Sequence, residues 1–366
     1  MSYTNGLDKP DLYFNTVLYT GDSATSTAGT LARTISGVGF QPDFVWVKGR
    51  TTGGYDSHGL HDVVRTAPKW LSSDGTSAEA DVTTGFNSGG IGSFTSDGFG
   101  IYSGIAGTTT NYNTSSTNYA SWNWKANGTG VSNTSGSITS TVSANTTSGF
   151  SIVSYTGNGS SGATIGHGLG VAPKMIITKQ RNSAGNWFVY HNKLPVTEYL
   201  ILNSTVAGQT DNEIIYNDTI PSSTTFTVGN YSQINGSSNT FVSYCFAEKK
   251  GFSKFGSYTG NGSTDGTFVY TGFKPAFVMF KRTDTTSDWN IYDTARAPNN
   301  VNNKVLQSNL SNAESTPSET VFDYLSNGFK PRGSPASINA SGGTYIYMAF
   351  AENPFVTSTG IPTTAR

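Results

Sequence analysis

The stretch SYTGNG (257–262), followed by GFKPAFVMFKR (272–282), holds the pattern around which this chain is organised. The same order recurs twice earlier, as LYTGDS (18–23) with GFQPDFVWVKGR (39–50) and as SYTGNG (154–159) with GVAPKMIITKQR (170–181). The interval from proline to lysine is the same each time: Pro42 to Lys48, Pro173 to Lys179 and Pro275 to Lys281. Such matching indicates an internal repeat, with three diverged copies of one module of roughly 100 residues, the size of a domain.

The composition favours strands over helices. Of the 366 residues, 12% are charged and 13% aromatic, 43 are glycine, and serine, threonine and asparagine are abundant. Ser, Thr and Asn compete with a helical backbone for hydrogen bonds, whereas Thr, Tyr, Phe and Val suit a pleated sheet. We therefore expect an all-β protein made of three tandem antiparallel β-sandwich modules of jelly-roll or lectin-like type, rigidly joined.

The repeats divide the chain into modules, a connector and two arms. The predicted boundaries are an N-terminal arm (1–16), module 1 (17–125), a connector (126–148), module 2 (149–250), module 3 (251–355) and a C-terminal arm (356–366). The first arm reads as an extended segment or an edge strand. The alternating run 137–143, with a turn at 145–149 into the run 150–155, favours a hairpin over a flexible linker.

Two segments of module 1 carry more specific expectations. Residues 59–68 are compatible with one helical turn, but strand and loop are favoured. In 119–125 Tyr119 and Ser121 alternate with Ala120 and Trp122, which predicts a strand with one buried face.

Charge and hydropathy exclude several classes of partner. The net charge is −1 and the basic residues are scattered, so no nucleic-acid or anionic-membrane footprint is expected. No apolar run approaches the ~18 residues of a membrane span. The start, MSYTNGLDKP, lacks a secretory pattern, so we expect synthesis in the cytoplasm. Cys245 lies in a strand pattern and is expected to be a buried, inert thiol.

No catalytic or metal-binding constellation recurs in register, so we expect no enzyme, no cofactor and no metal site. His58 and His61 read as a surface pair. Four carboxylates of module 1 find no match in the other copies: Asp56, Asp62, Glu79 and Asp81. The one repeated charged feature combines Lys48, Lys179 and Lys281 with Arg50, Arg181 and Arg282, for which a strand-end cation near an acidic neighbour is favoured over a ligand clamp.

Polar loops before each closing strand are the candidate binding elements. They comprise 104–118, 229–239 and 334–343, and they occupy one equivalent position in each copy. Tyr112 and Tyr231 lie in two of them. A loop tyrosine can stack on a sugar ring while Asn and Ser bond its hydroxyls, so these two are the candidate ligand-binding residues, against the alternative of solvated loops.

With these residues in view, the chain resembles a family of tandem β-sandwich modules of tailed-bacteriophage virion proteins, especially from phages of marine bacteria. The resemblance rests on YTGNG (155–159 and 258–262), on the three proline strands, on SDGF (96–99) and on closing strands such as YASWNWKA (119–126). It covers nearly the whole chain except the arms. It implies a concanavalin-like sandwich, a structural role in the virion and no enzymatic residue.

The leading hypothesis is therefore a non-enzymatic virion protein, part of a tail fibre or receptor-binding apparatus, whose loops meet host surface glycans. Its expected partners are other virion proteins and further copies of itself, in a trimer, since exposed sheet edges gain from neighbours that cover them. A head decoration protein with arms that lash neighbouring subunits is the alternative. A polysaccharide depolymerase would require a repeated acidic groove.

Overall fold

The computed structural model describes residues 7–51 and 57–363, and its regular structure is almost entirely antiparallel β-strand. The predicted all-β sandwich class is confirmed. Residues 1–6 and 364–366 of the predicted arms, and Asp56, lie outside the described residues.

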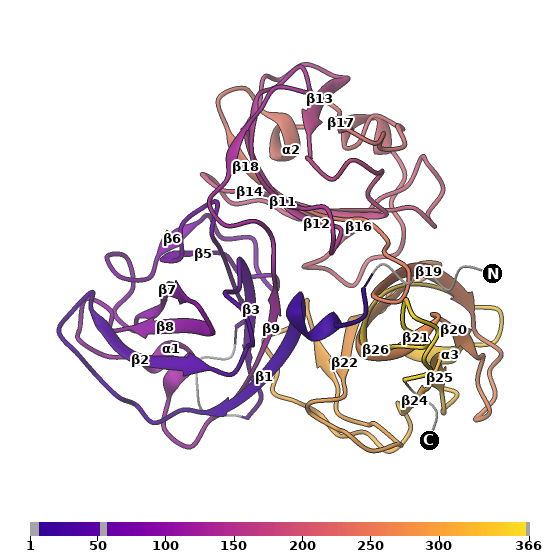
Figure 1. The fold of residues 1–366 in the computed structure, drawn as a ribbon. Helices are drawn as coiled ribbons and strands as arrows, with labels where there is room; N and C mark the ends of the chain where they lie inside the picture. Colours follow the sequence, from indigo (N-terminus) through magenta and orange to yellow (C-terminus); the bar gives the residue numbers. More distant parts are fainter. Residues whose placement is uncertain (1–6, 52–56, 364–366) are drawn as a thin grey trace.

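The strands gather into three lobes around a common centre (Figure 1). Lobe I contains a sheet in the order β1 (Phe14–Thr20), β9 (Asn118–Trp124), β3 (Phe44–Gly49), β4 (Gly59–Asp62), a sheet of β2 (Leu31–Ser36), β8 (Gly98–Tyr102) and β7 (Gly90–Thr95), and the pair β5 (Lys69–Trp70) and β6 (Ala80–Asp81). Its short helices are η1 (Pro10–Leu12) and α1 (Thr110–Asn113).

Lobes II and III repeat this plan with additions. Lobe II has a sheet in the order β10 (Val131–Asn133), β11 (Ser140–Asn145), β12 (Phe150–Thr156), β18 (Thr240–Phe246), β14 (Met175–Gln180), β15 (Trp187–His191), β16 (Leu200–Ile201), the pair β13 (Ala163–Gly166) and β17 (Thr225–Val228), and the helices η2 (Asn212–Ile214) and α2 (Ser232–Asn235). Lobe III has β19 (Ser253–Thr259), β26 (Thr344–Pro354), β21 (Phe273–Arg282), β22 (Trp289–Asp293), β23 (Leu306–Gln307), a second sheet of β20 (Val269–Tyr270), β25 (Gly328–Pro331) and β24 (Phe322–Leu325), and α3 (Ala336–Asn339).

The main sheets share one topology. In each main sheet, the strand that carries the motif tyrosine pairs with the closing strand. The closing strand also pairs with the proline strand, and the proline strand pairs with the next strand along the chain. The three strand orders are β1-β9-β3-β4, β12-β18-β14-β15 and β19-β26-β21-β22. Among the described residues, no sheet contains strands of two lobes.

The continuous apolar runs of the proline strands follow from burial on both faces. In β3, Val45 and Val47 face the core between the main sheet and the smaller sheet of lobe I. Phe44 and Trp46 face the other way, into a cluster shared with the other lobes. Because successive side chains of a strand point to opposite faces, a strand buried on both faces carries apolar residues without alternation.

The closing strand of lobe I differs from the sequence prediction for the same reason. Tyr119 lies in the core of lobe I, whereas Trp122 and Trp124 lie in the shared cluster. Ser121 and Asn123 are fully buried as well, so β9 has two buried faces rather than one. Their polarity suggested a solvated face, but both side chains have hydrogen-bond partners inside the protein.

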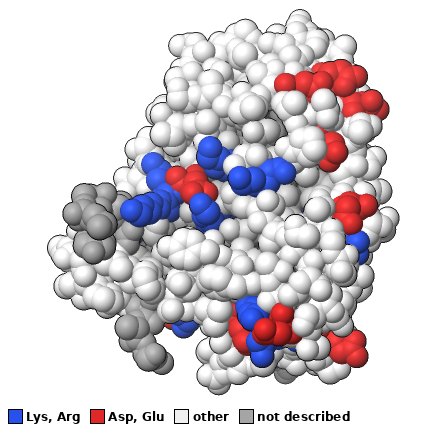
Figure 2. All heavy atoms as spheres, turned by 90° about the vertical axis from the view of Figure 1, so that its right-hand side faces the viewer, with Lys and Arg blue, Asp and Glu red and all other residues white. Residues whose placement is uncertain are grey.

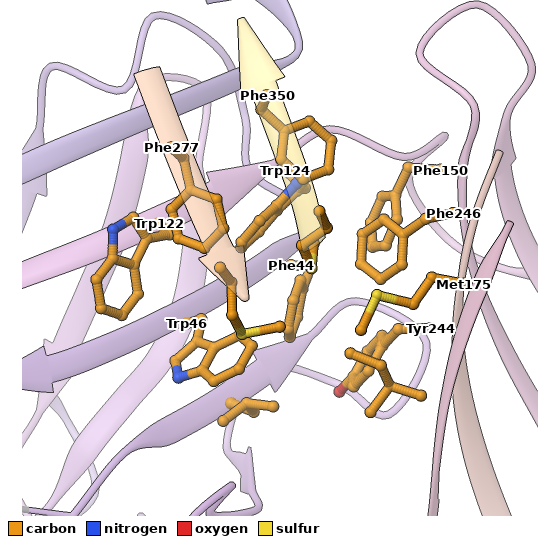
Figure 3. Close-up of a cluster of buried hydrophobic side chains, with 14 of the residues drawn as sticks. Phe44, Trp46, Trp122, Trp124, Phe150, Met175, Tyr244, Phe246, Phe277 and Phe350 are labelled. Carbon is orange, nitrogen blue, oxygen red and sulfur yellow. The ribbon is translucent and has the colours of Figure 1, made fainter. Parts of the chain in front are cut away.

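The shared cluster is an aromatic core at the meeting point of the lobes (Figure 3). The Trp124 ring lies 5.2 Å from that of Phe44 in lobe I, 6.3 Å from Phe246 in lobe II and 5.6 Å from Phe350 in lobe III. Each lobe therefore has a hydrophobic core of its own, and the central core holds the lobes together.

The terminal segments fold against the same chain. β1 starts at Phe14, so the edge-strand interpretation of the N-terminal arm holds from that residue on, and the boundary after residue 16 falls inside a strand. The Leu7 side chain is buried in the central core, and Asp8 bonds Ser358 of the C-terminal tail. The described parts of both arms therefore do not extend away from the molecule, which corrects that part of the prediction.

The predicted hairpin forms between β11 and β12, and β10 adds a further strand to it by pairing with β11. Residues 59–62 are a strand, also as favoured.

Candidate functional site

The repeated YTGNG motif builds a turn that is locked to the loop before the closing strand. The hydroxyl of Tyr155 donates to the carbonyl of Ile234, and that of Tyr258 donates to Ile338, each at 2.7–2.8 Å. In lobe I the hydroxyl of Tyr19 donates to Tyr112 at 2.9 Å. The motif tyrosine thus ties the first strand to a short helix in all three lobes.

A buried asparagine supplies further hydrogen bonds to each of these turns. Asn339 Nδ2 donates to the carbonyls of Ser263 and Gly333 at 2.7 and 3.1 Å, and its Oδ1 accepts from the backbone N–H of Asn261 at 3.0 Å. Asn235 makes the same set of bonds in lobe II, and Asn113 bonds Asp22 in lobe I. The asparagine of YTGNG is therefore a turn residue, and Asp22 replaces it without loss of the contact.

The first glycine of the motif has no room for a side chain. A Cβ on Gly157 would lie 2.5 Å from the carbonyl oxygen of Gly236. The final glycine of the motif has φ +76° at Gly159 and +68° at Gly262, a left-handed conformation that strains residues with a Cβ. Both glycines are therefore required by the shape of the turn.

Replacing Asn339 by alanine should lower the free energy of unfolding by about 1 to 3 kcal/mol, because the carbonyls of Ser263 and Gly333 lose their donor and that of Gly333 is buried. Urea denaturation monitored by tryptophan fluorescence measures this loss. Asn312→Ala is the control: Asn312 is exposed in the same lobe, and its replacement should stay within about 0.5 kcal/mol of the wild type. Equal stability of the two variants would refute the structural role of Asn339.

The two tyrosines predicted to bind a ligand have different surroundings. Tyr112 is 0% exposed, it lies in the core of lobe I, and its hydroxyl accepts a hydrogen bond from Trp70 Nε1 at 2.8 Å. Its ring therefore has no free face for a sugar, which corrects its assignment as a stacking platform. Tyr231 is half-buried at the start of α2, with its ring edge-on to that of Phe188, and its binding role stays a prediction.

The repeated lysines are buried clamps between lobes. Each ammonium group donates to the carbonyl of its own successor and to a carbonyl in the neighbouring lobe. The second acceptors are Ser311 for Lys48, Thr76 for Lys179 and Thr205 for Lys281, at 3.0–3.2 Å. A lysine of lobe I thus bonds lobe III, one of lobe II bonds lobe I, and one of lobe III bonds lobe II, so the three bonds connect the lobes in a ring. Burial lowers the pKa of Lys179 and Lys281 to about 8.

An ion-pair network, here called the lock, spans the interface between lobes I and II. Glu79 receives a bidentate pair of bonds from Arg181 of lobe II, both at 2.9 Å, and a further bond from buried Arg65 at 3.2 Å. Arg65 also pairs with Asp62, whose carboxylate accepts from the hydroxyl of Tyr244 at 2.8 Å.

The interface between lobes III and I carries a second lock of the same design. Glu314 receives Arg50 of lobe I through two bonds at 2.9 and 3.0 Å, and Arg296 at 3.0 Å. Arg296 pairs with Asp293, which accepts from Trp122 Nε1 at 3.0 Å. The two locks correspond residue by residue, so that Asp62 and Glu79, which found no match in the sequence, are matched by Asp293 and Glu314.

Acid should weaken both locks. Burial alone would raise the pKa of Glu79 and Glu314, but the hydrogen bonds and charges of their arginines outweigh it and hold the pKa below the ordinary value of 4.5. The unfolded chain then binds more protons than the folded one below about pH 4.5, so stability is lost as the pH falls through the folded pKa. Urea titrations from pH 7 to pH 3 should show this fall. Glu314→Gln should flatten it, and an unchanged slope would contradict the assignment.

The histidines are internal rather than a surface pair. His58 and His61 are both 0% exposed. His58 accepts from Trp46 Nε1 at 2.8 Å and contacts the carbonyl of Gln307 in lobe III, while His61 contacts that of Ala67. Burial lowers the pKa of both, to about 3 for His61, so they stay neutral near pH 7. Within residues 7–51 and 57–363, no group of His, Cys, Asp and Glu has a metal-binding arrangement. Cys245 is buried, as expected.

Comparison with known families gives one match. A model described as a domain of unknown function, DUF7483, matches residues 9–354, which include all three lobes. The chain belongs to the DUF7483 family. No curated protein and no solved structure matches it.

The locks of this DUF7483 protein have a sequence signal outside the repeated strands. Asp62-Val-Val-Arg65 and Asp293-Thr-Ala-Arg296 share the spacing D-x-x-R, and an Ala-Pro pair follows each. The segments from there to Glu79 and to Glu314 differ in length, which hides the match of the glutamates. In lobe III, Arg282 pairs with Asp284, and Thr283 occupies the place of Arg50 and Arg181, as its backbone bond to Thr344 shows.

The surface of the DUF7483 protein bears few charges. Figure 2 shows that most of this face is uncharged and that basic side chains gather in small groups beside acidic ones. A hollow of about 320 Å³ in lobe III is lined by Lys250, Lys254, Tyr270 and Phe355. Tyr270 is 59% exposed, and Phe268, two residues earlier, is 46% exposed. No helix among the described residues is long and apolar enough to cross a membrane.

Proposed function

We propose that this chain is a non-enzymatic structural protein of a bacteriophage particle, placed in the tail fibre or receptor-binding apparatus. One observation carries the structural part of the proposal: the side chains that recur in every repeat are used inside the molecule. The motif tyrosines, the asparagines of the turns and the three lysines all bond backbone groups of the same chain. The assignment to a bacteriophage particle rests on the resemblance of the motifs to those of virion proteins.

The contact with host glycans is proposed at the hollow of lobe III rather than at Tyr112. Tyr270 offers an exposed ring, and Lys250, Lys254 and Thr271 line the same hollow. An aromatic ring beside hydrogen-bonding groups suits the apolar face and the hydroxyls of a sugar. Tyr231 stays a further candidate for the same role.

A trimer of this chain is also part of the proposal. What supports it is the presence of sheet edges that neighbouring copies could cover: β1 in lobe I and β19 in lobe III are edge strands of their main sheets.

The deciding experiment is to locate the protein on intact particles with an antibody against the loop 104–118, where Ile105 is 53% exposed. Label at the tail supports the receptor-binding role, and particles with Tyr270→Ala should then adsorb less well to host cells. Ile220→Ala, at an exposed position of lobe II, is the matched control. Label over the head would replace this function by decoration, and release of reducing ends from host polysaccharide would replace it by a depolymerase.

A further inference from the structure

The interface between lobes II and III lacks the lock found at the other two. Where lobe I has Asp62, Arg65 and Glu79, lobe II has His191, Leu194 and Gly208 in the corresponding places. The backbone correspondence is direct: the N–H of Glu79 donates to Arg181 at 2.7 Å, that of Glu314 to Arg50 at 2.8 Å, and that of Gly208 to Thr283 at 2.8 Å. Thr283 thus stands where the other interfaces have the bridging arginine.

A cleft of about 590 Å³ opens at this interface. Its lining includes Lys193 and Glu198 from lobe II, and Ser257, Thr283 and Thr344 from lobe III. Asp284 also lines it, but its carboxylate is paired with Arg282 at 2.8 Å. Polar groups therefore face a space that a guanidinium group fills at the interface of lobes I and II.

The acceptors for a guanidinium group are retained in the cleft. At the first interface Arg181 bonds a carboxylate, Glu79, and a hydroxyl, Ser154 Oγ at 3.0 Å. Ser257 precedes its motif tyrosine as Ser154 does, and it lies in the cleft. Gly208 has no carboxylate, but that of Glu198 lies where a side chain of residue 208 would start. Glu198 Oε2 is 2.5 Å from the position of a Cβ on Gly208.

Glu198 has no arginine to receive. Among the described residues, no ion pair or side-chain hydrogen bond involves its carboxylate, and Lys193 forms no ion pair either. Leu194, in the place of Arg65, adds no charge. A carboxylate and a hydroxyl thus face a vacant place whose counterpart holds an arginine.

We propose that this cleft binds the guanidinium group of an arginine side chain presented by a partner protein. A bidentate bond of the guanidinium to Glu198 and a further bond to Ser257 would rebuild the third lock from outside. The neighbouring strand offers a place for the partner's backbone. β19 is an edge strand of its sheet, whereas the corresponding β12 of lobe II is covered by β11. An extended segment added to β19 would occupy the place that β11 has in lobe II.

The test uses the whole chain and two probes, N-acetyl-arginine amide and its neutral isostere N-acetyl-citrulline amide, titrated by heteronuclear NMR. The arginine probe should bind in the millimolar range and about tenfold or more tighter than the citrulline probe, since the neutral ureido group lacks the positive charge and has a carbonyl oxygen in place of one donor nitrogen. Shifted resonances should include those of Ser257 and Thr283.

Variants assign the binding to the cleft. Glu198→Gln should remove the preference for arginine. Thr283→Arg, which supplies a guanidinium group from within the chain, should block binding of the arginine probe. Glu248→Gln is the control, because the Glu248 carboxylate pairs with Lys254 away from the cleft, and it should leave binding of the arginine probe unchanged. Equal binding of both probes, or full binding to Glu198→Gln, would overturn the proposal. Thermal unfolding confirms that each variant is folded, and Ser257→Ala serves as a second, milder test if Thr283→Arg does not fold. The outcome is independent of the location of the protein on a particle.

Discussion

Replacing Trp124 by alanine should lower the free energy of unfolding by about 3 to 5 kcal/mol, the largest effect expected of any single substitution in this chain. The indole is 1% exposed and contacts aromatic rings of all three lobes, including Phe14 at 4.9 Å and Phe350 at 5.6 Å. Its removal leaves a cavity at the point where the lobes meet, and the surrounding sheets cannot collapse into it without losing their own cores.

The measurement is urea denaturation followed both by fluorescence and by far-ultraviolet circular dichroism. Because the central core joins the lobes, the loss should appear in one transition that both probes share. Trp124→Phe is the matched variant: it keeps a ring, and it removes an indole N–H that has no hydrogen-bond partner among the described residues. It should cost less than half as much. A cost below 1 kcal/mol for Trp124→Ala, on the scale of a surface change, would contradict a shared core.

Replacing Glu314 by alanine should lower the free energy of unfolding by about 3 kcal/mol or more, because it leaves a buried arginine with too few acceptors. The side chain of Arg296 is 0% exposed and that of Arg50 is 14% exposed. Arg296 keeps Asp293 after the substitution, whereas Arg50 loses both of its side-chain bonds to lobe III.

The control for Glu314→Ala is Asp265→Ala in the same lobe. Asp265 also pairs with two cations, Lys330 and Arg332, but its side chain is 74% exposed, so its removal should lower the stability far less than the removal of Glu314. Chemical denaturation of both variants at pH 7 measures the difference. Similar losses would show that the lock contributes no more than a surface ion pair.

Residue types and their local order determined much of this protein without the structure. The abundance of Thr, Ser, Gly and aromatic residues excludes a helical fold, because those residues suit strands and turns. The turn chemistry of YTGNG, the hairpin at 140–156 and the buried Cys245 were predictable because each depends on neighbours in the chain or on a simple apolar pattern.

Contacts between residues far apart in the sequence could not be predicted in the same way. An alternating strand such as 119–125 reads as half-buried, because its pattern does not reveal that a second core covers the polar face. Tyr112 reads as a loop residue for a similar reason: its neighbours are polar, yet Trp70 and the core of lobe I enclose it. The match of Glu79 with Glu314 was hidden by loops of unequal length, although the two glutamates occupy equivalent positions in their lobes.

The class of the fold and the positions of its strands and turns follow from side-chain chemistry over a few residues. Which faces are buried, which charges meet and where one lock is missing depend on how distant segments pack. The packing of three sheets around a common core brings together residues as distant as Arg50 and Glu314, and no local pattern encodes that encounter.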